Sequence, residues 1–226
     1  MQFQLGSIPV RIQGYFFIMA AVLGASERDP VRLLLWVAVV LVSILVHELG
    51  HALVGRMFGL APSIALHGMG GTTSFQPLPG RPARGSFGTV KNVLISLAGP
   101  CAGFAFGGAI YAAEVAGLVR TDNVLVGRAL SLLLAVNIGW GIFNLLPMLP
   151  LDGGNVLRSV ARAITWRHGD RIAHVVSLVI AVGIALYALS RGQWWSVYLG
   201  GLFAYQNFQA LRQLGASPPP AQRAVR

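Results

Sequence analysis

Long apolar segments dominate this sequence and constrain its fold more than any other feature. Six of them approach the ~20 residues that a helix needs to cross the hydrocarbon core of a bilayer. They cover residues 9–25, 31–58, 90–118, 124–146, 172–189 and 194–210. Of the 226 residues, 11% are charged, whereas a soluble domain carries about 25%. The sequence therefore predicts an all-α polytopic membrane protein with about six transmembrane helices.

The six segments leave little room for a soluble domain. We expect a single transmembrane core over residues 1–211, followed by a disordered tail over residues 212–226 that contains three consecutive prolines. The first segment is short, and Gly24-Ala25 could precede a signal-peptide cleavage site. Because five more segments follow, an uncleaved first helix is the preferred interpretation.

The basic residues indicate how the chain is oriented. They lie in short clusters between the apolar segments, which argues against a nucleic-acid partner despite the net charge of +10. With the N-terminus in the cytoplasm, 12 of the 17 Lys and Arg residues fall inside and five fall outside. The five outside are Arg28, Arg32, Arg120, Arg128 and Arg191. Both termini and the connection over residues 60–90 are therefore expected in the cytoplasm.

That connection has a sequence unlike a span. Its glycine-rich part, from Gly68 to Gly71, lies between the short runs 63–66 and 72–75, which favours a hairpin or a bulged strand, followed by a loop to Ser86. Non-helical backbone at membrane depth must be buried in protein or line a water-filled cavity. Residues 155–170 instead repeat apolar side chains at helical spacing, which predicts a helix on the cytoplasmic membrane surface.

The second segment carries the motif His47-Glu48-Leu49-Gly50-His51. Residues four apart share one face of a helix, so His47 and His51 can present imidazole nitrogens to one metal ion. Glu48 can then take a proton from a water molecule at that ion. Ionisable residues inside a span are costly, and they indicate function by default.

A hydrolytic zinc site needs a third protein ligand. The chain has seven acidic residues: Glu27, Asp29, Glu48, Glu114, Asp122, Asp152 and Asp170. In the expected topology only one besides Glu48 has the depth of the histidines, namely Asp152, just past the inner end of the fourth segment. Two prolines and two glycines around it allow the chain to fold back toward the metal.

Together these motifs resemble the site-2 protease family of intramembrane zinc metalloproteases. The family combines HExxH in one span with an NxxPxxPLDGG-type motif in a later one, read here from Asn144 to Gly154. Ser96-Leu97-Ala98-Gly99-Pro100 resembles its Gly-Pro motif, and Gly68–Gly71 its glycine-rich loop. The resemblance covers about residues 33–155. It shows no PDZ or CBS domain, so a minimal catalytic core is expected.

The resemblance implies a role for each matching residue. His47, His51 and Asp152 would bind one Zn²⁺ per chain, and Glu48 would act as general base and then as general acid. Asn144 would hold the substrate backbone or the developing oxyanion, and Gly68, Gly70 and Gly71 would help to bind an extended substrate. The implied partners are a transmembrane protein substrate and the bilayer, and homo-oligomerisation is left open.

Three other functions can be weighed against this one. A transporter or channel could hold a metal in its pathway, but it would not need a general base such as Glu48. A catalytically inactive scaffold would not need every catalytic position, and all of them are present. A membrane-anchored zinc protease of another family would cut soluble loops, but the LDGG motif after a span disfavours it.

Overall fold

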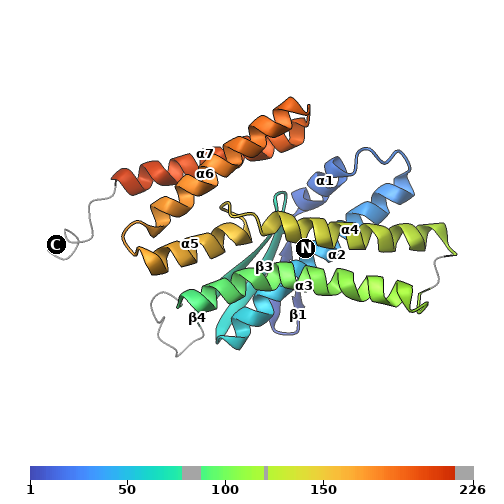
Figure 1. The fold of residues 1–226 in the computed structure, drawn as a ribbon. Coiled ribbons are helices and arrows are strands. Elements are labelled where there is room, and N and C mark those ends of the chain that lie inside the picture. The colour runs from blue at the N-terminus through green and yellow to red at the C-terminus, as the bar shows by residue number, and fades with distance from the viewer. Residues whose placement is uncertain (78–87, 120–121, 217–226) are drawn as a thin grey trace. The chain divides into compact units, whose positions relative to one another are not determined.

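The computed structural model describes residues 1–77, 88–119 and 122–216. The chain forms two compact units, one of residues 1–87 and 94–144 and the other of residues 88–93 and 145–226. The HExxH motif and a four-stranded sheet belong to the first unit, and three C-terminal helices belong to the second. Figure 1 labels the helices and most of the strands along the chain.

The sheet of the first unit is built from two antiparallel hairpins. Its strands are β1 (Gln2–Leu5), β2 (Ile8–Ile12), β3 (Leu60–His67) and β4 (Gly70–Pro77). Their order is β1-β2-β3-β4, and the parallel pairing of β2 with β3, with Val10 opposite Ile64, joins the hairpins. The hairpin or bulged strand predicted around Gly68–Gly71, with its runs at 63–66 and 72–75, is thus a hairpin whose strands cover residues 60–67 and 70–77. It forms half of a larger sheet.

The first apolar segment does not form the predicted span over residues 9–25. Its beginning is strand β2, and the helix that follows, α1 (Gly14–Leu23), has only 10 residues. At 1.5 Å per residue that helix is ~15 Å long, about half the thickness of a bilayer core. Ile8, Val10 and Ile12 are buried and the residues between them are exposed. This alternation belongs to a strand with one buried face, and an average of hydropathy over the segment conceals it.

Three longer helices complete the first unit. They are α2 (Pro30–Met57), α3 (Thr89–Val115, from Leu94 onward in this unit) and α4 (Val124–Asn144). The N-terminus of α2 is capped by Asp29, whose side chain accepts a hydrogen bond of 3.0 Å from the Val31 N–H, and Pro30 occupies the first turn. The predicted segments 31–58, 90–118 and 124–146 match these helices to within three residues.

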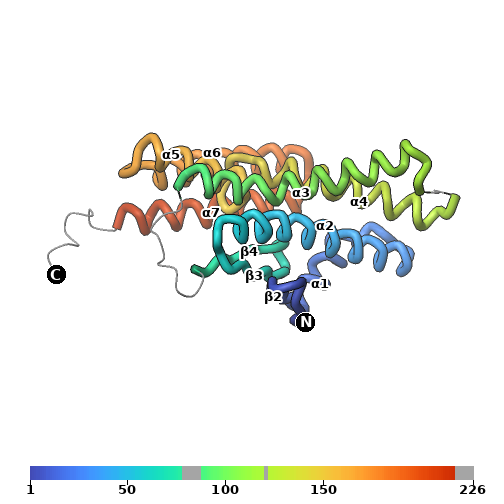
Figure 2. Tube along the Cα trace, turned by 90° about the horizontal axis from the view of Figure 1, so that it is seen from below, coloured from blue at the N-terminus to red at the C-terminus, as the bar shows by residue number. Residues whose placement is uncertain are grey.

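The core of the first unit lies between the sheet and α2. Figure 2 shows β2, β3 and β4 along one side of α2. Val10, Ile64 and Leu66 of the sheet are buried with Val40 and Ile44 of α2. The helix is therefore held along its length by strands that come from both sides of it in the sequence.

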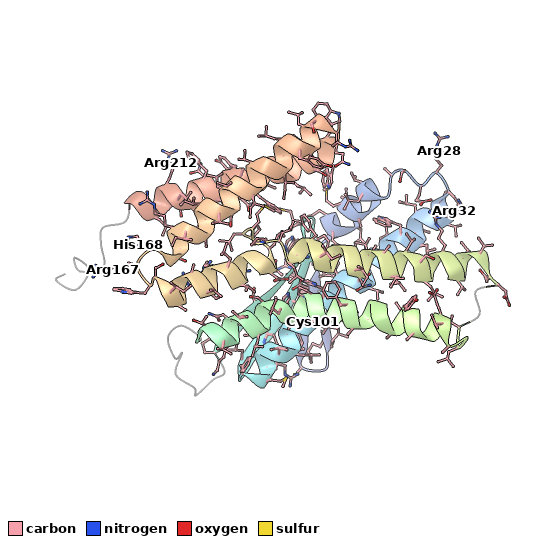
Figure 3. The ribbon with its side chains drawn as sticks, viewed as in Figure 1. Arg28, Arg32, Cys101, Arg167, His168 and Arg212 are labelled. Carbon is pink, nitrogen blue, oxygen red and sulfur yellow. The ribbon has the colours of Figure 1, made fainter. Side chains whose placement is uncertain are left out.

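The second unit consists of α5 (Asp152–Ile164), α6 (Gly169–Ser190) and α7 (Trp194–Ala216). Helices α6 and α7 lie side by side (Figure 1), and a Cβ at Gly200 would come within 3.0 Å of the Ala181 carbonyl. The helical segment expected within residues 155–170 is α5, which ends at Ile164. Figure 3 shows Arg167 and His168 at the turn between α5 and α6.

The first five residues of the tail predicted over residues 212–226 belong to a helix. Helix α7 continues through Ala216, because Leu211, Arg212 and Leu214 favour a helix and the first proline comes at residue 218. Residues 217–226 of the predicted tail lie outside the described residues, as does most of the loop predicted to follow the hairpin.

Four of the described helices are long and apolar enough to cross a membrane: α2, α3, α4 and α6. The expected count of about six spans is therefore not confirmed by the described helices. Helix α1 is too short, and α7 is long enough but carries Gln206, Asn207 and Gln209 within its apolar stretch. That α7 crosses the membrane stays a prediction, whereas the membrane character of the chain is supported by these four helices.

Candidate metal centre

Helix α2 presents His47 and His51 on one buried face. Their exposed fractions are 3% and 7%, and their Nε2 atoms lie 3.2 Å apart. The ring planes are nearly perpendicular, at 81°. Two nitrogens at this distance can bind one ion, as the four-residue spacing predicts.

The tautomer of His51 follows from its neighbour in α3. Its Nδ1 lies 2.6 Å from the carbonyl oxygen of Ile95, in a buried contact. A carbonyl only accepts hydrogen bonds, so Nδ1 carries the proton and donates it. In a neutral imidazole the lone pair is then on Nε2, which faces His47. Metal-binding histidines are commonly oriented by a backbone carbonyl in this way.

Gly99 of α3 leaves room for the two histidine nitrogens. A Cβ at this position would lie 2.2 Å from Nε2 of His51 and 2.8 Å from Nε2 of His47. No larger residue fits without displacing the rings. Gly99 thus forms one wall of the candidate site. The Ser96–Pro100 motif that contains this glycine stands out in the sequence, but the sequence gives it no role.

Glu48 is held by strand β4. It is 4% exposed, and its Oε2 accepts a hydrogen bond of 2.7 Å from the Thr73 hydroxyl, which also lies 3.1 Å from the Glu48 carbonyl. A Cβ at Gly71 would be 2.5 Å from Oε1 of Glu48. Gly71 and Thr73 are two residues apart, so they project from the same face of β4 onto the carboxylate.

The same face of β4 continues along α2. Phe75 follows Thr73 by two residues, and its ring fills the space beside Gly55, where a Cβ would lie 2.1 Å away. Glu48 and Gly55 are two helical turns apart on α2. The strand is therefore aligned along the helix at two points, which fixes its register against the catalytic motif.

The three glycines predicted to bind substrate have different surroundings. Gly71 touches Glu48, whereas Gly70 has a φ of +121° and lies against the ring of Trp140. Gly68 lies against Met19 and Tyr15 of α1. Of the three glycines, only Gly71 is in contact with Glu48, and substrate binding by all three stays a prediction.

His67 has a local role in the hairpin. Its Nδ1 accepts a hydrogen bond of 3.3 Å from the Met69 N–H, so the proton is on Nε2, which donates to the Thr72 hydroxyl at 2.8 Å. Both bonds lie within the β3–β4 turn. These two hydrogen bonds give His67 a structural role in the hairpin, and no catalytic role is needed to explain its presence.

Asn144 is the last residue of α4 and is 7% exposed. Its Nδ2 donates a hydrogen bond of 2.9 Å to the carbonyl of Trp140, one turn earlier. This bond fixes the plane of the carboxamide, which has a second N–H and an oxygen besides. Asn144 shares the first unit with the HExxH motif.

Asp152 is the first residue of α5 and is half-buried. The preceding segment folds back over the start of this helix, since a Cβ at Gly153 would lie 2.2 Å from the Leu145 carbonyl and one at Gly154 2.3 Å from the Leu149 nitrogen. The two glycines of the LDGG motif thus permit a close return of the chain. Because Asp152 belongs to the second unit, its role as third ligand stays a prediction.

The structure adds Thr73 to the residues that the sequence singled out. In the sequence it is only part of the strand-forming run 72–75, and the structure shows that its hydroxyl donates to Glu48. Position on a strand predicts which face a side chain occupies. It does not predict which helix that face covers.

A buried pair of histidines around a glutamate, in a helix that can span a membrane, defines a membrane metal-site protein of the metalloprotease class. The model of Peptidase family M50 matches residues 119–189. Rip3 of Mycobacterium tuberculosis (strain H37Rv), assigned to the zinc metalloproteases, is 33% identical over 210 residues, which cover 85% of this chain and 48% of Rip3. Protein sll0528 of Synechocystis, with the same assignment, is 33% identical over 176 residues, 73% of this chain and 43% of that protein.

Similarity extends to the archaea and to a solved structure. The zinc metalloprotease MJ0392 of Methanocaldococcus jannaschii is 25% identical over 193 residues, 83% of this chain and 53% of that protein. The structure of the site-2 protease from the same organism shares this fold, with a TM-score of 0.65, 21% identity and coverage of 93% of this chain and 94% of that chain. The chain spans about half the length of the curated relatives it matches. It belongs to the site-2 protease family.

Proposed function

We propose that this chain is an intramembrane zinc endopeptidase that hydrolyses peptide bonds of transmembrane substrates near the cytoplasmic side of the membrane. One observation carries the proposal: two buried imidazole Nε2 atoms converge to 3.2 Å in a helix apolar enough to span a membrane, and the glutamate between them is also buried. Placing three ionisable side chains in a membrane-spanning helix costs free energy, so such residues are expected to have a function.

His47, His51 and Asp152 hold the zinc ion, one per chain. The tautomer of His51 and the space beside Gly99 fit this role, and two imidazoles with a carboxylate suit zinc better than the harder cations. The role of Asp152 as the third ligand is supported by the elimination of the other acidic residues and by its place in the LDGG motif. When bound, zinc supplies Lewis-acid activation of the scissile carbonyl and of water.

Glu48 acts first as the general base and then as the general acid of the reaction. Thr73 holds Oε2 of the carboxylate, and this carboxylate takes a proton from the attacking water and later gives it to the leaving nitrogen. A carboxylate with one oxygen fixed keeps its orientation through both transfers. Thr73 is thus a positioning residue for the general base.

The substrate binds as an extended segment along β4. Peptide bonds within a helix are shielded by their hydrogen bonds, so the substrate must unwind locally before attack. Strand β4 is at the edge of the sheet, and its backbone can pair with an added strand. Gly68, Gly70 and Gly71 keep the adjoining turn narrow, and the second N–H of Asn144 donates to the substrate carbonyl or to the developing oxyanion.

Both termini lie in the cytoplasm, together with the sheet. The charge distribution supports this orientation, and the pairing of β2 with β3 places the N-terminal strand in the same sheet as the hairpin. The substrate is a membrane protein, and the bilayer surrounds the catalytic unit. A homo-oligomer would be compatible with the same site.

The decisive experiment compares the wild-type chain with Glu48→Gln and His47→Ala in detergent. Each sample is assayed for cleavage of a model transmembrane substrate and for bound zinc. We expect cleavage only by the wild type, retention of zinc by Glu48→Gln, and loss of zinc by His47→Ala. Removing a general base should lower the rate by about 10²–10⁴-fold.

The other outcomes separate the alternative functions. If the wild type and Glu48→Gln both bind zinc and neither cuts several transmembrane substrates, a transporter or an inactive scaffold is favoured. Cleavage of soluble loops alone would favour a membrane-anchored protease of another kind. Absence of zinc from the wild type after reconstitution would contradict the metal centre itself.

A further inference from the structure

In the second unit, both backbone groups of Leu149 are bound by side chains of the two C-terminal helices. The Leu149 N–H donates to Oγ of Ser177 in α6 at 2.8 Å. The Leu149 carbonyl accepts a hydrogen bond of 2.8 Å from Nδ2 of Asn207 in α7. The segment before α5 is thus tied to both helices at a single residue.

The two side chains that bind Leu149 are fully enclosed. Ser177 is 0% exposed and Asn207 is 2% exposed. Ser177 lies in an apolar stretch of α6, and Asn207 faces the interior of the unit between the exposed residues of α7, so Ala or Leu at either position would serve helix packing at lower cost. Polar residues buried in such helices are expected to do more than fill space.

The hydrogen-bonding groups of this cluster satisfy one another. The Ser177 hydroxyl donates to the Ala173 carbonyl at 2.7 Å, and Asn207 also donates to the Phe203 carbonyl at 2.8 Å. The remaining group of Asn207, its Oδ1, accepts a hydrogen bond of 2.8 Å from Nδ1 of His174. A fully satisfied network of this kind has one arrangement, and it therefore fixes the backbone that it holds.

The fixed backbone leads directly to Asp152. Leu149 precedes that aspartate by three residues, and the turn between them is closed by a hydrogen bond of 2.9 Å from the Leu151 N–H to the Met148 carbonyl. Met148 and Leu151 are buried on either side of Leu149. Little freedom remains between the bound residue and the start of α5.

We propose that Ser177 and Asn207 are positioning residues for the zinc ligand Asp152, so that α6 and α7 set the zinc affinity of the site through Leu149. The inference rests on the proposed function, in which Asp152 is the third ligand. If the two side chains only joined helices, their removal would destabilise the fold without changing the metal affinity that depends on Asp152.

The test measures zinc affinity by chelator competition on the purified full chain, with the unfolding midpoint as a second readout. Ser177→Ala removes one hydroxyl and leaves the Leu149 N–H without its acceptor. Ser159→Ala is the matched control: Ser159 is 9% exposed and its hydroxyl donates only within its own helix, to the Asn155 carbonyl at 2.8 Å. Asn207→Leu removes the second contact with Leu149.

We expect Ser177→Ala and Asn207→Leu each to raise the zinc dissociation constant about 10–100-fold, as for other residues that orient a metal ligand. Ser159→Ala should leave it unchanged. In an Asp152→Asn background, Ser177→Ala should cause no further loss, because the ligand that it positions is already gone. If Asn207→Leu does not fold, Ser177→Ala and its double variant decide the question.

The outcomes distinguish the two proposals. Wild-type zinc affinity in Asp152→Asn would contradict the proposed ligand set. Weakened affinity in Asp152→Asn with unchanged affinity in Ser177→Ala would overturn the positioning role alone. An equal loss on adding Ser177→Ala to the wild type and to Asp152→Asn would also overturn it, because the effect would then not pass through Asp152.

Discussion

The Thr73 hydroxyl donates a hydrogen bond of 2.7 Å to Oε2 of Glu48, across 25 residues of sequence. In the proposed function, the strand that the substrate extends and the residue that moves the proton are thus joined by one hydrogen bond. A peptide added to β4 would lie beside a carboxylate that the same strand already orients. The proposed function therefore couples substrate binding and proton transfer through β4.

Removal of that hydroxyl should impair catalysis and spare the metal. For Thr73→Val we expect a fall in the cleavage rate of about 10–100-fold, because the general base loses its fixed orientation. Thr73→Ser keeps the hydroxyl and should recover most of the rate. Thr72→Val, on the opposite face of β4, is the control. Cleavage and bound zinc are measured on all four proteins, and a rate for Thr73→Val equal to that of the wild type would contradict the role.

A side chain at Gly99 should prevent zinc binding. The Cβ of Gly99→Ala would lie 2.2 Å from Nε2 of His51, so the imidazole must move away from the metal position. We expect the zinc dissociation constant to rise by more than about 100-fold, beyond the effect of losing one orienting hydrogen bond. Gly103→Ala, one turn later in α3, meets its nearest neighbour at 3.4 Å and should bind zinc normally. Equal affinity in the two variants would show that the space beside Gly99 is not needed.

The contact between Ser43 and Asn137 should stabilise the packing of α2 against α4. Nδ2 of Asn137 donates to the Ser43 hydroxyl at 2.9 Å, and both residues are buried. We expect Ser43→Ala to lower the free energy of unfolding by about 0.5–2 kcal/mol. Ser131→Ala, whose hydroxyl binds its own helix at Gly127, should change it little. A double-mutant cycle with Asn137→Ala measures the coupling, which should vanish if the pair does not interact.

The N-terminal strand and the hairpin should be accessible from the same side of the membrane. Gln4 in β1 and Gln76 in β4 are exposed and belong to one sheet, whereas Figure 3 shows Arg28 at the connection between α1 and α2. In a Cys101→Ala background, an impermeant thiol reagent applied to intact cells should label Arg28→Cys and not Gln4→Cys or Gln76→Cys. Labelling of Gln4→Cys and Gln76→Cys from opposite sides would contradict the sheet, and labelling of both from outside would reverse the orientation.

Local spacing accounts for what could be predicted of the fold. Helices α2, α3, α4 and α6 follow from apolar stretches whose length and composition are visible in the sequence, and the β3–β4 hairpin follows from its glycines. The sequence wrongly predicts a span over residues 9–25, because a strand with one buried face and the helix that follows it have together the mean hydropathy of a transmembrane helix. The pairing of β2 with β3 joins residues that are more than 50 positions apart in the sequence, and no local pattern predicts it.

The same division holds for the site. The motif alone places His47 and His51 on one helix face with Glu48 near them, because the pitch of an α-helix leaves no other arrangement. The packing of the helices and the sheet is needed to see that Ile95 sets the tautomer of His51, that Thr73 holds Glu48, and that Ser177 and Asn207 hold Leu149. These contacts join residues 25 to 58 positions apart, and they depend on how helices and strands pack rather than on the period of any one of them.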